Sequence, residues 1–258
     1  KAFFALAALE DKATTPDELI DCHNTLTAYV EGRKVNTAPH TEAGVITFSQ
    51  IIERSNNIGI AKVAKRYGEP LYEHYKKLGF GQKTDIPFPG EQAGFLMHPK
   101  QWSKQSVISL SYGYEVSATL LQLATAFCVF ANGGYRIYPR LVVDQKMITP
   151  EKIYSNDTIE TMRTILHETA LSGSAKYAHV HGYITLGKTS TANLLEHGQY
   201  NPHKNLYGFV GCIEKGSYKR VIACFTKESP QHNLYSATVA APLFHRIAEK
   251  TILHDKAW

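Results

Sequence analysis

The sequence predicts a mixed α/β (α+β) fold in two lobes, with an antiparallel sheet packed by helices and an all-helical lobe. Three observations lead to this fold class. The chain opens on an apolar helix, its middle holds several helices with clear start and stop residues, and its last third holds short β-rich runs before a final helix. Helices followed by neighbouring strands indicate a sheet segregated from a helical layer. We expect the helical lobe at about 20–150 and the sheet-containing lobe at 1–19 and 151–258.

The composition supports a globular domain of this size. Of the 258 residues, 43% are hydrophobic and 20% are charged, which is enough apolar material for a buried core. No run approaches the roughly 20 apolar residues of a membrane helix. The net charge of +5 comes from lysines and arginines spread along the chain, without an aromatic–basic nucleic-acid motif. We therefore expect no nucleic-acid partner.

The first ten residues predict a buried helix, because they are good helix formers and offer no polar face. A chain end inside such a helix is unusual, since termini normally lie on the surface. We therefore expect that a covering segment precedes Lys1. Residues 11–44 contain turn formers without periodicity and predict a loop-rich connection.

Start and stop residues define the helices of the middle. Thr47 and Gln50 have the spacing of a capping box, and Asn56-Asn57 predicts the cap of a helix that stops at Gly68. The same reasoning predicts three further helices, at 70–79, 119–130 and 155–171. The glycine- and proline-rich residues 80–102 predict an irregular segment.

The last third predicts strands. Residues 183–191, 206–213 and 220–225 are rich in β-branched and aromatic side chains, and 214–217 has the composition of a hairpin turn. An amphipathic helix is expected from about 241 to 254.

The four cysteines leave the redox compartment open. None forms a C-x-x-C pair, and Cys128 in an apolar helix is expected to be a buried free thiol. Cys212 and Cys224 lie on neighbouring predicted strands, where a disulfide is conceivable but nothing in the spacing requires one.

Three short elements carry the candidate chemistry. Lys1 begins the apolar helix, Ser55-Asn56-Asn57 lies between two helices, and Lys188-Thr-Ser-Thr191 lies on a strand. The set S-x-x-K, S-D-N and K-T-G is the signature of penicillin-binding proteins and class A β-lactamases. Each element alone is weak, because S-x-N is also an ordinary helix cap and a strand-edge lysine is usually solvated. Their order and context strengthen the signal.

Longer blocks carry a resemblance over nearly the whole chain. They resemble class B penicillin-binding proteins, the peptidoglycan D,D-transpeptidases of the serine β-lactamase-like superfamily. The blocks are Lys1–Glu10, Phe48–Gly59, Leu78–Gly81 through Pro89–Glu91, Ser111–Ala124, Ala131–Gly134, Tyr207–Gly211 and Val239–Phe244. The resemblance is to the C-terminal portion of the transpeptidase domain.

The resemblance implies cross-linking of peptidoglycan stem peptides through a serine acyl-enzyme, with inhibition by covalent penicillin and other β-lactams. In that chemistry Lys1 would take the proton of the nucleophile and Ser55 would relay one to the departing D-alanine. Asn57 would bind the acyl-donor amide and orient Lys1. Lys188 would supply positive potential.

The resemblance also implies that Thr189, Ser190 and Thr191 form the substrate-binding strand. The Thr189 and Thr191 hydroxyls would bind the substrate carboxylate, and the Thr191 backbone N–H would be an oxyanion donor. This chain departs from the family in two ways. Ser190 replaces a glycine, and no residue precedes Lys1, whereas the family's nucleophilic serine lies three positions earlier. We therefore expect an N-terminally truncated fold that lacks its nucleophile.

The family further implies a setting. We expect the periplasmic side of the inner membrane in the bacterial cell envelope, an upstream membrane anchor, and partners in cell-wall synthesis, cell division or cell shape. No cofactor and no metal are expected. His179 and His181, with His197 and His203 downstream, invite a metal site, but no cysteine or acid follows at a typical ligand spacing.

Three alternatives to a transpeptidase stay open. A D,D-carboxypeptidase or a β-lactamase of the same superfamily would share the three motifs. A β-lactamase of class A needs a deacylating glutamate in an E-x-x-L-N sequence, and the chain contains no such sequence. A non-catalytic penicillin-binding scaffold would have no chemical need for Lys1, Ser55, Asn57 and Lys188 together.

Overall fold

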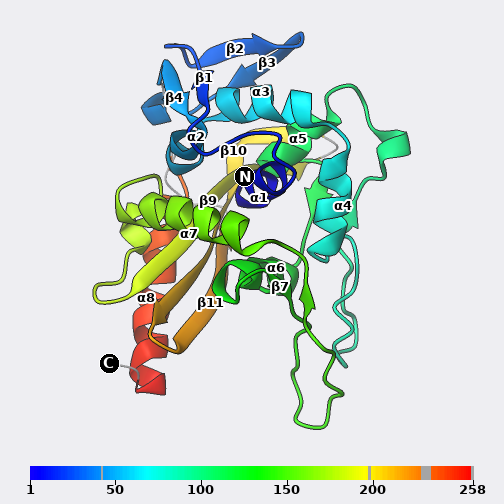
Figure 1. Ribbon diagram of the computed structural model, residues 1–258, viewed down its shortest axis with the longest axis vertical. Coiled ribbons are helices and arrows are strands. Elements are labelled where there is room, and N and C mark those ends of the chain that lie inside the picture. The colour runs from blue at the N-terminus through cyan, green and yellow to red at the C-terminus, as the bar shows by residue number, and fades with distance from the viewer. Residues whose placement is uncertain (42, 197–198, 228–233, 257–258) are drawn as a thin grey trace. The chain divides into compact units, whose positions relative to one another are not determined.

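The computed structural model describes residues 1–41, 43–196, 199–227 and 234–256. The chain divides into two compact units, unit 1 (Lys1–Ile165) and unit 2 (Leu166–Trp258), whose elements are labelled in Figure 1. The predicted mixed α/β class is confirmed. The lobe boundaries expected from the sequence stay a prediction.

Unit 1 is mainly helical. Its helices are α1 (Ala2–Glu10), α2 (Phe48–Arg54), α3 (Asn57–Tyr67), α4 (Pro70–Lys77), α5 (Ser106–Tyr112) and α6 (Leu120–Ala131), and α7 (Asn156–Leu171) crosses the border between the units. Short antiparallel pairs join β1 (Leu19–Asp21) to β4 (Val45–Thr47), β2 (Thr27–Val30) to β3 (Arg33–Asn36), β5 (Phe95–Leu96) to β6 (Val116–Ser117), and β7 (Tyr135–Arg136) to β8 (Glu151–Lys152). Single 3-10 turns are η1 (Pro39–Thr41) and η2 (Pro99–Gln101).

Residues of unit 1 themselves cover α1. Phe4 and Leu6 are fully buried. The Phe3 ring lies 5.2 Å from the Phe80 ring and 6.1 Å from the Phe130 ring, centroid to centroid. The predicted buried helix is confirmed, and residues of this chain already cover much of it. Aromatic residues from distant parts of the unit supply the cover.

The helix boundaries of unit 1 follow the predicted caps. Thr47 begins α2 with a capping box, in which its hydroxyl accepts from the Gln50 N–H while the Gln50 side chain accepts from the Thr47 N–H. Thr119 caps α6 in the same way. Gly68 ends α3 with φ 82°, and Pro70 begins α4. Within the described residues, no helix combines the length and apolar character needed to cross a membrane.

Residues 11–44 are more regular than expected. They contain β1, the β2–β3 hairpin and η1 instead of loop alone. Glu31 and Gly32 form the hairpin turn, both with positive φ, and Val30 pairs with Arg33 across it. Two positive φ angles suit the twist of a two-residue hairpin turn. The strands are only three or four residues long, too short to produce a recognisable period.

Unit 2 is built on a three-stranded antiparallel sheet. The strands are β9 (Ile184–Glu196), β10 (Gln199–Lys215) and β11 (Tyr218–Lys227), in the order β11-β10-β9. All three predicted strands are confirmed. β10 and β11 extend beyond both predicted ends, whereas β9 begins one residue late and extends only at its C-terminal end. The predicted turn is also confirmed, because Lys215 pairs with Tyr218 and Gly216 has φ 60°. Within the described sheet β9 is an edge strand.

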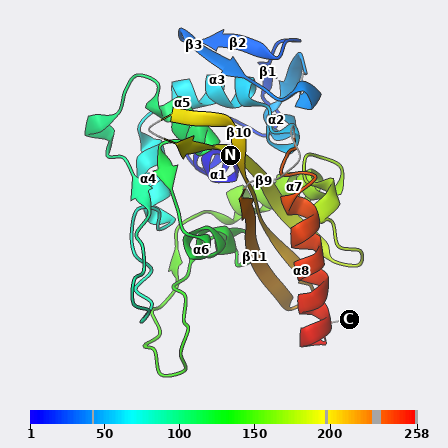
Figure 2. The same ribbon diagram turned by 180° about the vertical axis from the view of Figure 1, so that it is seen from behind.

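The helix α8 (Ala240–Asp255) packs against β10 and β11, beside which it runs in both views (Figure 1 and Figure 2). The 3-10 turn η3 (Lys176–Ala178) joins the same core. The Phe244 ring of α8 lies 4.5 Å from the Phe209 ring of β10. A Cβ at Gly187 would lie 2.3 Å from the Phe209 ring, so only glycine allows this close approach. The core of unit 2 therefore lies between the sheet and α8.

All four cysteines are free thiols. Cys212 pairs with Val221 in the ladder and Cys224 pairs with Phe209, so the two cysteines are not cross-strand neighbours. The disulfide left open by the sequence is not formed. Burial raises the pKa of the Cys224 thiol to about 11, which makes it a poor nucleophile at neutral pH.

Candidate active site

Lys1 has the properties of a base. It lies at the N-cap of α1 with its side chain half-buried. Burial disfavours the charged form and lowers the pKa of Lys1 from 10.5 to about 8. Its Nζ lies 5.9 Å from the centroid of the Tyr112 ring, and the Arg33 guanidinium lies 6.0 Å from the same ring. A fraction of such a lysine is neutral at pH 7 and can accept a proton.

Ser55 and Asn57 lie in the break between α2 and α3. Ser55 ends α2 in the left-handed conformation, with φ 62° and ψ 35°. A non-glycine residue in this region carries strain of order 1 kcal/mol or more, and such positions cluster at functional sites. Asn57 begins α3, and its Nδ2 donates to the Asn36 carbonyl at 2.7 Å. The Asn57 Oδ1 is buried and has no hydrogen-bond partner among the described residues.

Asn56, the middle residue of the motif, is structural. It is fully buried, its Oδ1 accepts from the Gly59 N–H at 2.9 Å, and its Nδ2 donates to the Thr41 carbonyl at 2.7 Å. Both the oxygen and the nitrogen of the Asn56 side chain are therefore hydrogen-bonded to backbone groups, which stabilises the break between α2 and α3. Asn57 is left with an unused acceptor.

Residues at the two ends of the strand β3 contact the surroundings of Lys1 and of Asn57. At its start Arg33 contacts the Tyr112 ring that also faces Lys1, and it donates to the Gln105 carbonyl and the Ser109 hydroxyl on α5. At its end Asn36 holds the Asn57 amide. Lys1 and Asn57 are thus tied to the same short strand through named contacts.

Lys188 is a buried cation of unit 2. It is only 5% exposed, although a lysine is rarely buried without partners. Its Nζ donates to the Ser174 Oγ at 3.2 Å and to the Thr189 Oγ1 at 3.4 Å. Both of these partners are neutral hydroxyls.

The rest of the K-T-S-T sequence lies along the edge strand β9. Thr189 is half-buried, while Ser190 and Thr191 are exposed. They pair with Phe209, Gly208 and Tyr207 of β10 on one side only. The other side of β9 is a sheet edge in the described residues, where an extended peptide can add as a further strand.

The histidines show no metal centre. Among the described residues, no group of three or more histidine, cysteine or acidic side chains is placed to hold a metal ion. His179 instead has its pKa lowered by burial and by His167, His181 and His245. His197 and the His203 side chain lie outside the described residues.

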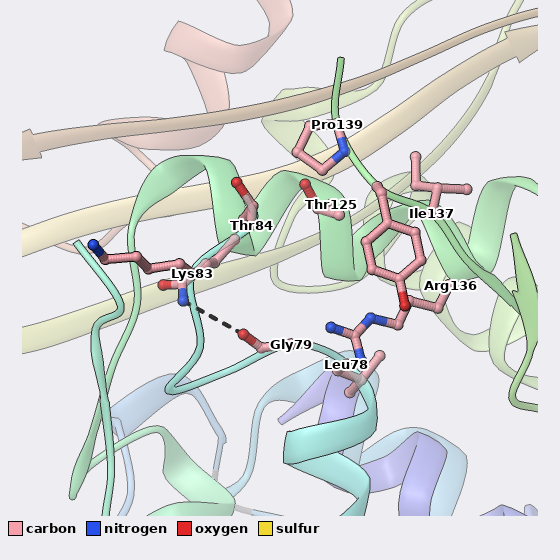
Figure 3. Close-up of a pocket in the computed structure, with 10 residues that line it drawn as sticks. Leu78, Gly79, Lys83, Thr84, Thr125, Arg136, Ile137 and Pro139 are labelled. Carbon is pink, nitrogen blue, oxygen red and sulfur yellow. Dashed lines mark hydrogen bonds between the residues drawn. The ribbon is translucent and has the colours of Figure 1, made fainter. Parts of the chain in front are cut away.

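A small pocket in unit 1 contains none of the predicted site residues (Figure 3). Arg136, Lys83 and Thr125 contribute to its lining, and the Gln122 side chain donates to the Gly79 carbonyl beside it. Its free volume of about 20 Å³ is room for a single water. It is too small for a peptide substrate.

Each unit holds side chains with functional groups of its own. Unit 1 holds a lysine of lowered pKa, a serine with a left-handed backbone, and an asparagine whose buried side-chain oxygen has no hydrogen-bond partner among the described residues. Unit 2 holds a buried cation next to a strand edge. Acyl transfer from a peptide needs a base, a proton route to the leaving amine and a site for the carboxylate and oxyanion.

A family comparison decides the assignment. The family described as penicillin binding protein transpeptidase domain matches residues 1–249. This chain belongs to that family. Its relatives are class B penicillin-binding proteins, as the sequence blocks indicated.

Individual relatives agree with the family assignment. Penicillin-binding protein PbpB of Mycolicibacterium smegmatis is 30% identical over 96% of this chain and 41% of its own length. The probable peptidoglycan D,D-transpeptidase PenA of Neisseria gonorrhoeae is 29% identical over 76% of this chain and 34% of its own length. The chain thus spans about two fifths or less of these curated relatives.

Solved structures show the same fold. The apo transpeptidase domain of Burkholderia pseudomallei penicillin-binding protein 3 is 28% identical, with a TM-score of 0.89 over 100% of this chain and 78% of that one. Penicillin-binding protein 3 of Mycobacterium tuberculosis, complexed with aztreonam, is 26% identical, with a TM-score of 0.86 over 99% of this chain and 61% of that one.

Three residues that touch the predicted site were missed by sequence reasoning. Tyr112 faces Lys1, Ser174 contacts the Lys188 ammonium, and Ser236 contacts Ser190 and Thr191. The sequence separation is 14 residues for Ser174 and Lys188 and 46 for Ser236 and Ser190, and Tyr112 lies farther still from Lys1 along the chain. No local pattern links partners so far apart.

Proposed function

We propose that this penicillin-binding protein is a peptidoglycan D,D-transpeptidase that cross-links stem peptides through a serine acyl-enzyme. The observation that carries the proposal is the lowered pKa of Lys1, at the position where the family places its base. The three motifs and the family match over residues 1–249 support it.

The acylation half-reaction assigns one role to each residue. A serine three positions before Lys1 attacks the carbonyl carbon of the penultimate D-alanine, and its proton passes to Lys1. The C–N bond to the terminal D-alanine breaks as the leaving amine takes a proton relayed through Ser55. Asn57 binds the donor amide, and Lys188 attracts the terminal carboxylate.

The substrate lies along β9 in this proposal. Thr189, Ser190 and Thr191 form the strand that an extended donor peptide joins, and the Thr191 N–H stabilises the oxyanion. In the second half-reaction an acceptor amine attacks the acyl-enzyme ester and gives up its proton to the same base. The ester C–O bond breaks as the base returns a proton to the serine oxygen, which frees the serine. Lys1, Ser55, Asn57 and Lys188 would therefore converge on one cleft.

We also propose that β-lactams acylate the same serine. Aztreonam and ampicillin complexes of the Mycobacterium tuberculosis penicillin-binding protein 3 support this proposal by similarity. Because the chain lacks an E-x-x-L-N sequence, the acyl-enzyme would wait for an amine rather than hydrolyse, which favours a transpeptidase over a β-lactamase.

The bacterial cell-wall relatives support a place in the cell envelope, and the finer setting is part of our proposal. We place the protein in the bacterial cell envelope on the periplasmic side, held by an upstream anchor and working with other cell-wall synthesis or division proteins. A D,D-carboxypeptidase remains the second candidate, because it shares the acylation half-reaction and differs only in the acceptor.

The test uses the natural full-length protein with a stem pentapeptide donor and an amine acceptor, read by mass spectrometry. The proposal predicts cross-linked product and released D-alanine, both lost in a Lys188→Ala variant. Release of D-alanine without cross-linked product would identify a carboxypeptidase. Loss of neither activity in the variant would remove Lys188 from the mechanism.

A further inference from the structure

Ser236 fastens the substrate-binding strand from outside the three motifs. It is 1% exposed and lies just before α8, where its carbonyl accepts from the Ala240 and Ala241 N–H groups, both at 2.9 Å. Its backbone is therefore anchored to the first turn of α8, and its side chain is free to point elsewhere. From there it reaches Ser190 and Thr191 on β9.

The Ser236 hydroxyl has one proton, and its contacts decide where that proton goes. The Ser236 Oγ bonds the Ser190 carbonyl oxygen, which can only accept. The single proton of Ser236 is therefore donated to Ser190. Ser236 has none left for the Thr191 Oγ1, which lies 2.8 Å away.

The Thr191 hydroxyl proton is committed as a consequence. Since Ser236 cannot donate, the 2.8 Å contact requires Thr191 to donate to the Ser236 Oγ. The Ser236 backbone N–H donates in turn to the Thr191 Oγ1 at 3.0 Å. The Thr191 hydroxyl is thus closed into an internal network and has no proton to offer a ligand.

Thr189 is in the opposite state. Its Oγ1 accepts from the Lys188 ammonium at 3.4 Å, and among the described residues it donates to no acceptor. Its proton is available. A carboxylate has only acceptor atoms, so it can use the Thr189 hydroxyl and not the Thr191 hydroxyl.

We propose that Ser236 determines ligand specificity by withdrawing the Thr191 hydroxyl from carboxylate recognition, which leaves Thr189 as the hydroxyl donor of the strand. This inference rests on the proposed function. It changes the expectation that the Thr189 and Thr191 hydroxyls both bind the substrate carboxylate. Removing the Ser236 hydroxyl returns a donor to the site, so binding of carboxylate ligands improves. A purely structural serine would have the opposite effect.

The test compares a penicillin with its methyl ester in the natural full-length protein, measuring the second-order acylation rate of each. Ser236→Ala keeps the backbone N–H that positions Thr191 and frees the Thr191 proton. The acid-to-ester rate ratio should rise by about tenfold, the lower range for one hydrogen bond to a charged group. An unchanged or lower ratio overturns the proposal.

A second pair of variants keeps the proposal testable if Ser236→Ala does not fold. Thr189→Val should lower the acid-to-ester ratio of the parent protein more than Thr191→Val does, and equal or reversed losses overturn the proposal. In the Ser236→Ala background, Thr191→Val should abolish the gain. If the parent protein is acylated by neither ligand, the proposed function is wrong. If the parent is acylated but the acid-to-ester rate ratios of the variants do not follow the predicted order, only the role of Ser236 is wrong.

Discussion

Replacing Lys1 by methionine should stabilise the protein while it removes the proposed base. Methionine is unbranched and similar in length to lysine but carries no charge to desolvate. The lowered pKa means that the folded protein holds the Lys1 ammonium in an unfavourable setting. Removing a group held for function commonly raises stability, because activity and stability make opposing demands on such sites.

The size of the effect follows from the pKa. Lowering it from 10.5 to about 8 corresponds to roughly 3 kcal/mol of lost folding free energy when Lys1 is charged. The Tyr112 ring offsets about 0.5–1 kcal/mol of this by its attraction for the ammonium, and partial exposure reduces it further. We expect Lys1→Met to gain about 1–3 kcal/mol at pH 7.

The pH dependence gives this effect a signature. Between pH 8 and 10.5 the folded protein binds fewer protons at Lys1 than the unfolded chain, so its stability rises with pH in this window. The cost is complete below pH 8 and absent above 10.5. The advantage of Lys1→Met should therefore shrink as pH rises through the window.

Denaturant unfolding of the parent, Lys1→Met and the exposed control Lys146→Met measures this difference directly. The control should stay within about 0.5 kcal/mol of the parent at every pH. A Lys1→Met variant that is less stable than the parent at pH 7, or whose advantage is constant from pH 7 to 10.5, would refute the reasoning.

Three further predictions separate structural from functional residues. Asn56→Ala should lower the free energy of unfolding by about 2–3 kcal/mol in denaturant unfolding, because the buried Thr41 carbonyl and the N-terminus of α3 lose their hydrogen-bond partner. Asn57→Ala should cost less stability and abolish penicillin labelling. Equal stability losses in the two variants would contradict this division of roles. Gly187→Ala should lower the free energy of unfolding by about 1–3 kcal/mol, because its Cβ meets the Phe209 ring, and an unchanged melting temperature argues against this packing. Ser190→Gly should change the β-lactam acylation rate more than the melting temperature, and equal rates would exclude Ser190 from ligand recognition.

Features with short-range causes could be predicted from the sequence. The capping boxes at Thr47 and Thr119 depend on partners three residues away, and the helix stop at Gly68 depends on one backbone angle. The long strands of unit 2 were found because β-branched and aromatic residues dominate them. Lys1 and Lys188 could be identified as candidate catalytic residues because each belongs to a short sequence motif.

Features that depend on distant partners could not be predicted from the sequence. The cover of α1 comes from Phe80 and Phe130, which no local period connects to Phe3. The motif S-N-N does not reveal that Asn56 is structural while Asn57 keeps a free acceptor. Ser236 looks like any serine before a helix until the fold brings it to Thr191.

The most direct test of the account is a crystal structure of the natural full-length protein acylated by a penicillin. The central proposal is that Lys1, Ser55, Asn57 and Lys188 all serve one acyl-transfer reaction. It predicts an ester on the serine three positions before Lys1, with the Lys188 Nζ within roughly 6 Å of the Ser55 Oγ, about the span of a hydrogen-bonded bridge through one water. An adduct on Ser55, or a Lys188 ammonium beyond that distance, would contradict the proposal.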